Sequence, residues 1–192
     1  MEIIGITGKS GTGKSTFTEM LAKKYKYCTK VDIDKIGHFS LVDPEIIERL
    51  RKNFGDGILD ENGNINRKKV GDLVFAERHN MEILKELTWE FMQQKIDKIL
   101  SGSSKTVILE WILLPHSKYW DMCNTKILVC ANEQERRDKI IKRDNISEEY
   151  LNKRDSASID YSSYKFDHIV ENHYEDGEIR RAVDDIFREI EK

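Results

Sequence analysis

The sequence predicts an α/β fold in which a five-stranded parallel sheet is flanked by helices. Two observations lead to this prediction. Short apolar runs typical of buried strands alternate with segments of helical spacing, and this alternation favours parallel strands joined by crossover helices. The first apolar run also leads through a glycine-rich turn into a helical segment. The predicted strands are Ile3–Thr7, Cys28–Ile33, Thr106–Glu110, Lys126–Cys130 and His168–Val170.

Helices are predicted from the periodicity of apolar residues between these strands. The clearest is the last one, in which Ile179, Val183 and Ile186 recur at helical spacing. Asn66 is expected to cap the helix that follows it, because its side-chain oxygen can accept hydrogen bonds from the N–H groups of the first turn. The predicted helices are Thr16–Tyr25, Pro44–Asn53, Arg67–Ala76, Arg78–Leu100 and Asp176–Glu191.

Residues 8–15 read GKSGTGKS and directly follow the first predicted strand. This is the G-x-x-x-x-G-K-S/T pattern of a phosphate-binding loop (P-loop), in the strand-before, helix-after context that it requires. Glycines let the backbone turn its N–H groups toward one point, and the following helix adds the positive end of its dipole. We expect Lys14 to reach the β- and γ-phosphates of ATP and the Ser15 hydroxyl to bind Mg²⁺. The fold is therefore predicted to be of P-loop NTPase type, with nucleotide-binding residues Gly11, Thr12, Gly13, Lys14, Ser15 and Thr16.

Two carboxylates, Asp32 and Asp34, follow the second predicted strand. Ligands of open parallel sheets bind beyond the carboxyl ends of the strands, where the P-loop also lies. Asp34 is expected to orient an acceptor hydroxyl and to take its proton late in phosphoryl transfer. Asp32 would hold a Mg²⁺-bound water or position the acceptor. The alternative is that the pair caps the next helix; His38, one turn later, either contacts the acceptor or is merely exposed.

The third predicted strand ends in an acid, Glu110. A strand-end carboxylate in a P-loop protein supports Mg²⁺ through water, although acids at strand ends also cap helices. The sequence leaves open both this choice and whether Asp32 or Glu110 lies nearer to Mg²⁺.

Glu133–Asp144 is dense in charge and places several cations on one helical face. Closing cations stabilise the negative charge on the oxygens of a phosphoryl group in transfer, so we expect a lid over about 136–160 with Arg143 as its catalytic arginine. The alternative is an ordinary solvated face paired with acids of the same helix. The cations of this region are Arg136, Lys139, Arg143, Lys153 and Arg154.

Composition limits the other functions. The 192 residues contain no linker-like segment, which favours one domain over 1–192 with a helical insert at about 43–101. Formal charge is −3, so neither nucleic acid nor a membrane surface is an expected partner. Three cysteines without C-x-x-C spacing favour a reducing compartment and no zinc site. The first strand begins at once and leaves no room for a signal peptide, so the cytoplasm is expected.

Two motif matches suggest a GTPase, and we reject both. Asn152–Asp155 matches N-K-x-D and Asp60–Gly63 matches D-x-x-G. A guanine-reading motif should end a buried strand, whereas Glu148–Leu151 is no such strand, and Asp60–Gly63 has the composition of a polar turn.

The order of these motifs resembles the dephospho-CoA kinase family over nearly the whole chain. The resemblance implies a P-loop kinase core, a helical acceptor-binding region and a lid. It also implies Mg-ATP-dependent phosphorylation of the ribose 3′-hydroxyl of dephospho-CoA, with Asp34 as base and with Asp32, His38, Arg67 and Arg154 near the substrate. Six segments carry the resemblance. Three of them are Asp32–His38, similar to the family's D-x-D-x-x-x-H/R, Phe54–Gly55, similar to F-G, and Gly63–Val70, similar to G-x-L-D-R-x-x-L. The other three are Val74–Phe75, similar to V-F, Arg143–Asp144, similar to R-D, and Phe166–Asn172, similar to A-D-x-V-I-x-N.

Four departures from the family pattern fall in regions that would contact or shape the acceptor site. Trp89-Glu90 replaces H-P, Ile112–His116 replaces P-L-L-F-E, and Asn66 replaces the Asp of L-D-R. A glutamine of the family's lid has no counterpart near Ser158. They keep open a P-loop kinase that acts on another small acceptor, such as a nucleoside, a nucleotide or another alcohol. A nucleotide-sensing protein without catalysis is a further alternative, against which the retained Lys14 and Asp34 argue. Oligomeric state and the choice between ATP and GTP stay open.

Overall fold

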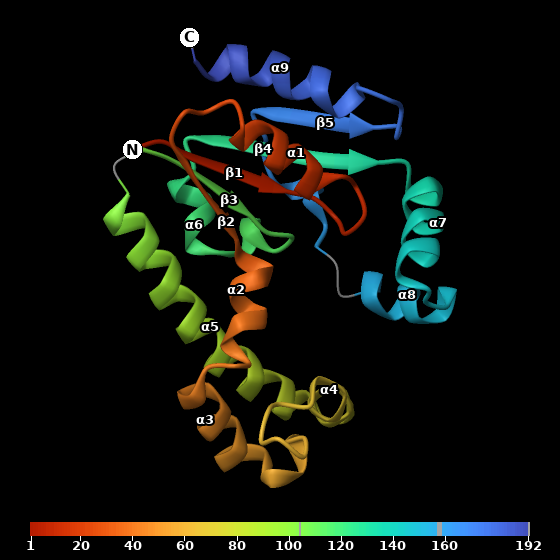
Figure 1. Cartoon of the computed structure of the whole chain (residues 1–192). Helices are drawn as coiled ribbons and strands as arrows, with labels where there is room; N and C mark the ends of the chain where they lie inside the picture. Colours follow the sequence, from red (N-terminus) through yellow and green to blue (C-terminus); the bar gives the residue numbers. More distant parts are fainter. Residues whose placement is uncertain (104, 157–158, 192) are drawn as a thin grey trace. The chain divides into compact units, whose positions relative to one another are not determined.

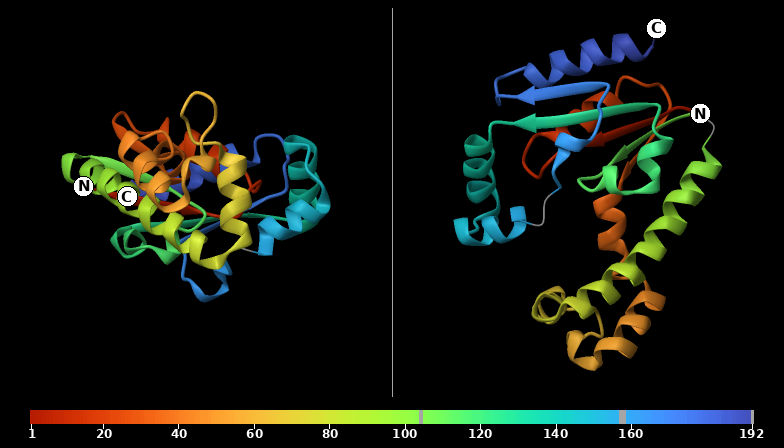
Figure 2. Two further views of the ribbon diagram at one scale, coloured as in Figure 1. Left: turned by 90° about the horizontal axis from the view of Figure 1, so that it is seen from below. Right: turned by 180° about the vertical axis from the view of Figure 1, so that it is seen from behind.

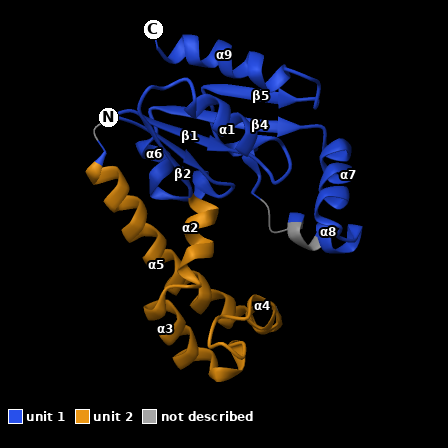
Figure 3. Ribbon diagram, viewed as in Figure 1, with its two compact units in different colours: residues 1–32, 103–192 blue, residues 33–102 orange. Residues whose placement is uncertain are grey.

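The computed structural model describes residues 1–103, 105–156 and 159–191, with their side chains except those of Phe75, Lys153, Arg154 and Ser156. The chain divides into two compact units (Figure 3). The first comprises Met1–Asp32 and Ser103–Lys192, and the second comprises Ile33–Gly102. The helical insert predicted at about 43–101 falls inside the second unit, which begins earlier, at Ile33.

The first unit contains a five-stranded sheet in the order β2-β3-β1-β4-β5 (Figure 1). All neighbouring strands within the described residues are parallel, which confirms the predicted fold class. Because the strands are parallel, their carboxyl ends meet at one edge, and there Asp32 pairs in register with Glu110. The strands are β1 (Ile3–Thr7), β2 (Cys28–Asp32), β3 (Thr106–Glu110), β4 (Thr125–Ala131) and β5 (His168–Asn172).

Helices of the first unit bury apolar faces against this sheet. Phe17 and Leu21 of one helix and Val183 of the last helix join Ile4 and Val129 of the strands in one core. Burial of such side chains contributes about 1.5–3 kcal/mol each. The right-hand view of Figure 2 shows the last helix running along the last strand of the sheet, with which it is in contact. The helices are α1 (Lys14–Ala22), α6 (Lys118–Met122), α7 (Glu133–Asp144), α8 (Glu148–Ser156) and α9 (Glu178–Ile190), with 3₁₀ turns η2 (Leu114–His116) and η3 (Tyr161–Ser163).

The second unit is helical and has its own core, which includes Ile46, Leu50, Val70 and Leu87. Asn66 caps α4 as predicted, because its side chain accepts a hydrogen bond from the N–H of Lys69. Its elements are α2 (Ile33–Ser40), α3 (Pro44–Phe54), η1 (Asp56–Ile58), α4 (Arg67–Ala76) and α5 (Arg78–Gly102).

Helix α2 was not predicted, and the second strand was predicted one residue too long. β2 ends at Asp32, opposite the end of β3 at Glu110, and Ile33 already begins the helix. Ile33 is fully buried, but by its position in the helix rather than in the strand. A β-branched residue two positions after Val31 continues the alternation of a strand locally, so only tertiary packing distinguishes the two. Helix α1 also begins earlier than predicted, at Lys14, directly after the P-loop.

Candidate active site

The P-loop connects β1 to α1 in a backbone path that requires glycine. Gly8 has φ +146° and Gly13 has φ +91°, conformations that residues with a Cβ rarely adopt. A Cβ on Gly8 would lie 2.1 Å from the carbonyl oxygen of Val129, and one on Gly13 would lie 2.5 Å from Nδ2 of Asn172. The motif glycines are therefore required by both torsion angle and space.

Lys14 and Ser15 both contact Glu110 where α1 begins. The Lys14 ammonium lies 2.8 Å from Oε1 of Glu110, and the Ser15 hydroxyl donates to the same oxygen at 2.5 Å. The side chains of Lys14 and Glu110 are only 11% and 4% exposed. Glu110 thus bonds to the P-loop rather than capping a helix, since the N-cap position of the following turn η2 is Leu113 and no side chain caps it.

Asp32 belongs to the same edge because it pairs in register with Glu110 across β2 and β3. The Ser15 hydroxyl, through its hydrogen bond to Glu110, lies at this edge as well. No group of three or more His, Cys, Asp or Glu side chains able to hold a metal occurs among the described residues.

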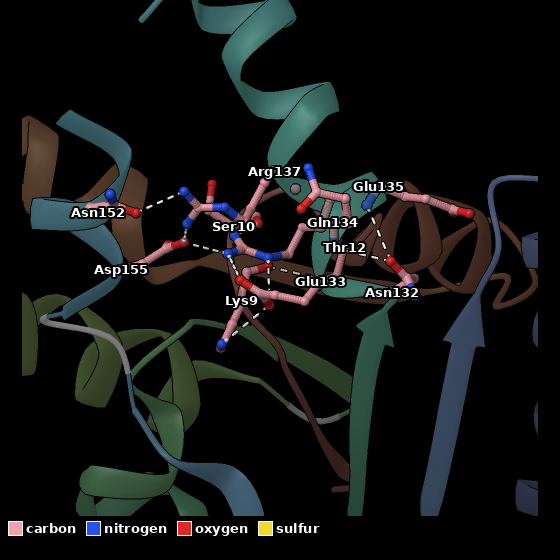
Figure 4. A network of polar contacts seen from close by, with 12 residues as sticks. Lys9, Ser10, Thr12, Asn132, Glu133, Gln134, Glu135, Arg137, Asn152 and Asp155 are labelled. Carbon is pink, nitrogen blue, oxygen red and sulfur yellow. Dashed lines mark hydrogen bonds and ion pairs between the residues drawn. The ribbon is translucent and has the colours of Figure 1, made fainter. Parts of the chain in front are cut away.

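Arg136 is a buried cation on α7 that contacts the P-loop. Its side chain is 1% exposed, and Nη1 donates to the carbonyl oxygen of Ser10 at 2.9 Å. It also pairs with Glu133, 2.6 Å from Nη2 to Oε1, and with Asp155 of α8. Figure 4 shows Lys9 and Ser10 of the loop beside Glu133 and Asp155. The hydrogen bonds from Arg136 hold the pKa of Glu133 below its usual value.

The sequence analysis placed Arg136 and Arg143 on one helical face, either solvated or part of a lid. In the structure the side chain of Arg136 is buried, whereas that of Arg143 is exposed. The described contacts of Arg143 are with Asp144, at 2.6 Å from Nε to Oδ1, and its side chain is 60% exposed. A spacing of seven residues does place both on one helical side, but it does not reveal that α8 covers the first of them. The side chain of Arg154 lies outside the described part of the chain.

Two residues at and just after the end of β5 also contact the loop, and the sequence analysis assigned them no role. Nδ2 of Asn172 donates to the carbonyl of Thr12, and the hydroxyl of Tyr174 donates to the carbonyl of Gly11, both at 2.9 Å. Asn172 was noted only as the end of a motif in the family resemblance.

A hollow of about 200 Å³ lies beside the loop. It is lined by Lys9, Thr12, Leu128, Val129, Cys130, Ala131, Glu133, Arg136 and Tyr161.

The remaining candidate residues belong to the second unit. Asp34 lies in the first turn of α2, His38 lies one turn later, and both are exposed. Arg67 is the first residue of α4 and is also exposed. These three side chains are accessible to a ligand. The rejected N-K-x-D match lies on α8 rather than at the end of a strand.

Comparison with known proteins places these features in one family. A family model described as dephospho-CoA kinase matches residues 2–176. The dephospho-CoA kinase of Aquifex aeolicus (strain VF5) is 32% identical over 195 residues, which cover 99% of this chain and 98% of the relative. The solved dephospho-CoA kinase of Campylobacter jejuni has a TM-score of 0.67 and 25% identity, with 98% of this chain and 97% of that chain covered. The crystal structure of TT1252 from Thermus thermophilus is similar in fold, with a TM-score of 0.82, 24% identity and coverage of 98% of this chain and 97% of that chain.

Within the described residues, no helix has the length and apolar character needed to cross a membrane.

Proposed function

The chain belongs to the dephospho-CoA kinase family, and on this premise we propose how its residues carry out the reaction. The protein phosphorylates dephospho-CoA with ATP to give coenzyme A; we place the transfer at the ribose 3′-hydroxyl and the reaction in the cytoplasm. The observation that supports this most directly is the P-loop whose Lys14 and Ser15 meet Glu110 at the edge of the sheet.

In the proposed reaction the acceptor oxygen forms a bond to the γ-phosphorus as the bond from that phosphorus to the bridging oxygen of ADP breaks. Asp34 orients the acceptor hydroxyl and takes its proton late in this displacement. Lys14 leaves Glu110 for the β- and γ-phosphate oxygens and neutralises the charge that develops there. Arg143, in an exposed position on α7, is proposed to approach the transferred group from the lid. His38, Arg67 and Arg154 are proposed to contact the acceptor.

Mg²⁺ is the proposed divalent ion, held by the Ser15 hydroxyl with Glu110 and Asp32 supporting its water ligands. When bound, the ion supplies positive charge beside the β- and γ-phosphates. The short contact between Ser15 and Glu110 and the register pairing of Asp32 with Glu110 support this assignment.

Glu110→Gln is expected to weaken the use of Mg²⁺ more than the binding of nucleotide. Removing an outer ligand typically costs about 10–100-fold in metal affinity, so the Mg²⁺ concentration for half-maximal rate should rise about tenfold. Affinity for ADP without Mg²⁺ should not fall, since Lys14 no longer has a carboxylate competing with phosphate. Rates over a Mg²⁺ titration and calorimetry with ADP in EDTA measure the two effects.

The matched control is Glu171→Gln, which removes the charge of an exposed glutamate on β5 of the same sheet. It should leave the Mg²⁺ titration unchanged. An unchanged titration in Glu110→Gln as well would remove Glu110 from the metal site.

A panel of acceptors tests the substrate. With ATP and Mg²⁺, we expect turnover of dephospho-CoA and little turnover of adenosine, AMP or pantetheine. Phosphorus NMR of the product should show a new ribose 3′-phosphate. Turnover of another alcohol without turnover of dephospho-CoA would support the acceptor alternative suggested by Trp89-Glu90 and Ile112–His116, although the family match does not favour it.

A further inference from the structure

We propose that Asn172, the last residue of β5, and Tyr174, two residues later, are positioning residues that set the P-loop in its phosphate-binding shape. This inference rests on the proposed function, because it concerns the same loop. It assigns these side chains no contact with substrate: they act through the backbone of the loop.

The two side chains hold consecutive carbonyl groups. Asn172 is 4% exposed and donates from Nδ2 to the Thr12 carbonyl at 2.9 Å. Tyr174 donates from its hydroxyl to the Gly11 carbonyl at 2.9 Å. Arg136 does the same for the preceding carbonyl, that of Ser10. Three successive loop carbonyls are thus bonded to side chains from α7, from the end of β5 and from the segment that follows it.

Holding a carbonyl also orients the next N–H group. A trans peptide is planar, so the N–H of each residue points opposite to the C=O of the residue before it. The bond to the Thr12 carbonyl therefore directs the N–H of Gly13 away from Asn172. The N–H of Thr12, directed away from Tyr174, donates to the carbonyl of Lys9 at 3.4 Å and closes the loop. An anion site needs such N–H groups to converge, and a carbonyl oxygen turned into it would repel phosphate.

The backbone at Tyr174 is itself held in an unusual conformation. Its φ is +61°, which is uncommon for a bulky side chain and stores strain. Oδ1 of Asn172 accepts from the Tyr174 N–H at 2.9 Å, so the same amide holds both the loop and the tyrosine backbone. Strain of this kind persists where the surroundings fix the residue for a function.

Tyr174→Phe tests this inference, because it removes the hydroxyl and keeps the ring over which Lys139 lies, 4.3 Å from the ring centroid. The dissociation constants of ADP and of tripolyphosphate should both rise about fivefold, the size expected for one hydrogen bond. The KM for ATP should rise similarly, whereas kcat and the KM for dephospho-CoA should change less than about twofold. Calorimetry and steady-state kinetics give these values.

The control is Tyr27→Phe, in which an exposed tyrosine under the Lys105 ammonium, 3.2 Å from its ring centroid, also loses its hydroxyl. Its ligand affinities should match the wild type. Asn172→Asp is the second variant: it keeps the acceptor for Tyr174 but turns an acceptor toward Thr12, and should weaken ADP binding more than Tyr174→Phe does.

Three results would overturn the inference. One is equal affinity for both ligands in Tyr174→Phe and Tyr27→Phe. Another is weaker binding of ADP with unchanged tripolyphosphate, which would mean that Tyr174 contacts the base. The third is a melting temperature more than about 8 °C below that of the control, which exceeds the loss expected for one hydrogen bond in a chain of this size and would indicate a general role in stability. If the wild type binds neither ligand, the proposed function fails too, so the two failures are distinguishable.

Discussion

Lys14→Ala should lower turnover about 10³-fold or more, because it removes a charge-stabilising donor placed where negative charge develops. Lys14 is the partner of a carboxylate that is 4% exposed, so the substitution also leaves Glu110 buried without its cation. Removing one member of a buried pair costs about 3–5 kcal/mol. The free energy of unfolding should fall accordingly, and denaturant titration measures it.

A double variant separates these two effects. Lys14→Ala with Glu110→Gln replaces the unpaired carboxylate with a neutral amide, so it should recover a large part of the lost stability while turnover stays low. Recovery of turnover along with stability would contradict the role of Lys14 in phosphoryl transfer. Comparison with Glu110→Gln alone completes the double-mutant cycle.

Asp34→Asn should lower kcat about 10²–10⁴-fold, the usual contribution of a general base. Affinity for ATP should stay within about twofold, since the amide has the same shape and Asp34 is proposed to contact the acceptor. The alternative from the sequence gives Asp34 only a helix-start role, because a carboxylate in the first turn of α2 stabilises the helix by about 0.3–1 kcal/mol. Single-turnover kinetics and thermal unfolding distinguish the two roles.

Asp43→Asn is the matched control for this measurement. Asp43 caps α3 by accepting from the N–H of Glu45, and asparagine caps helices about as well as aspartate. The control should therefore keep both kcat and melting temperature. A full rate in Asp34→Asn, together with a small loss of stability, would assign Asp34 to the helix start.

Local patterns were sufficient to predict most of the fold. The five strands were predicted from their apolar runs, the P-loop from its glycines and the helix Glu133–Asp144 from the helical spacing of its cations, all signals that span only a few residues. The predicted cap at Asn66 is likewise a contact between near neighbours in the sequence. Glu110 was identified as a candidate because it ends a predicted strand, and the carboxyl ends of parallel strands lie at the edge of the sheet where phosphate binds.

By itself, then, the sequence determined the five strands and their order along the chain, the phosphate loop and the family to which the chain belongs. The tertiary structure alone decided that Ile33 begins α2, that Arg136 is buried, and that Asn172 and Tyr174 bond to the loop. Asp155 and Tyr174 are 19 and 163 residues from the groups they contact. Periodicity describes which face of one element is apolar, whereas these contacts depend on which other element covers that face.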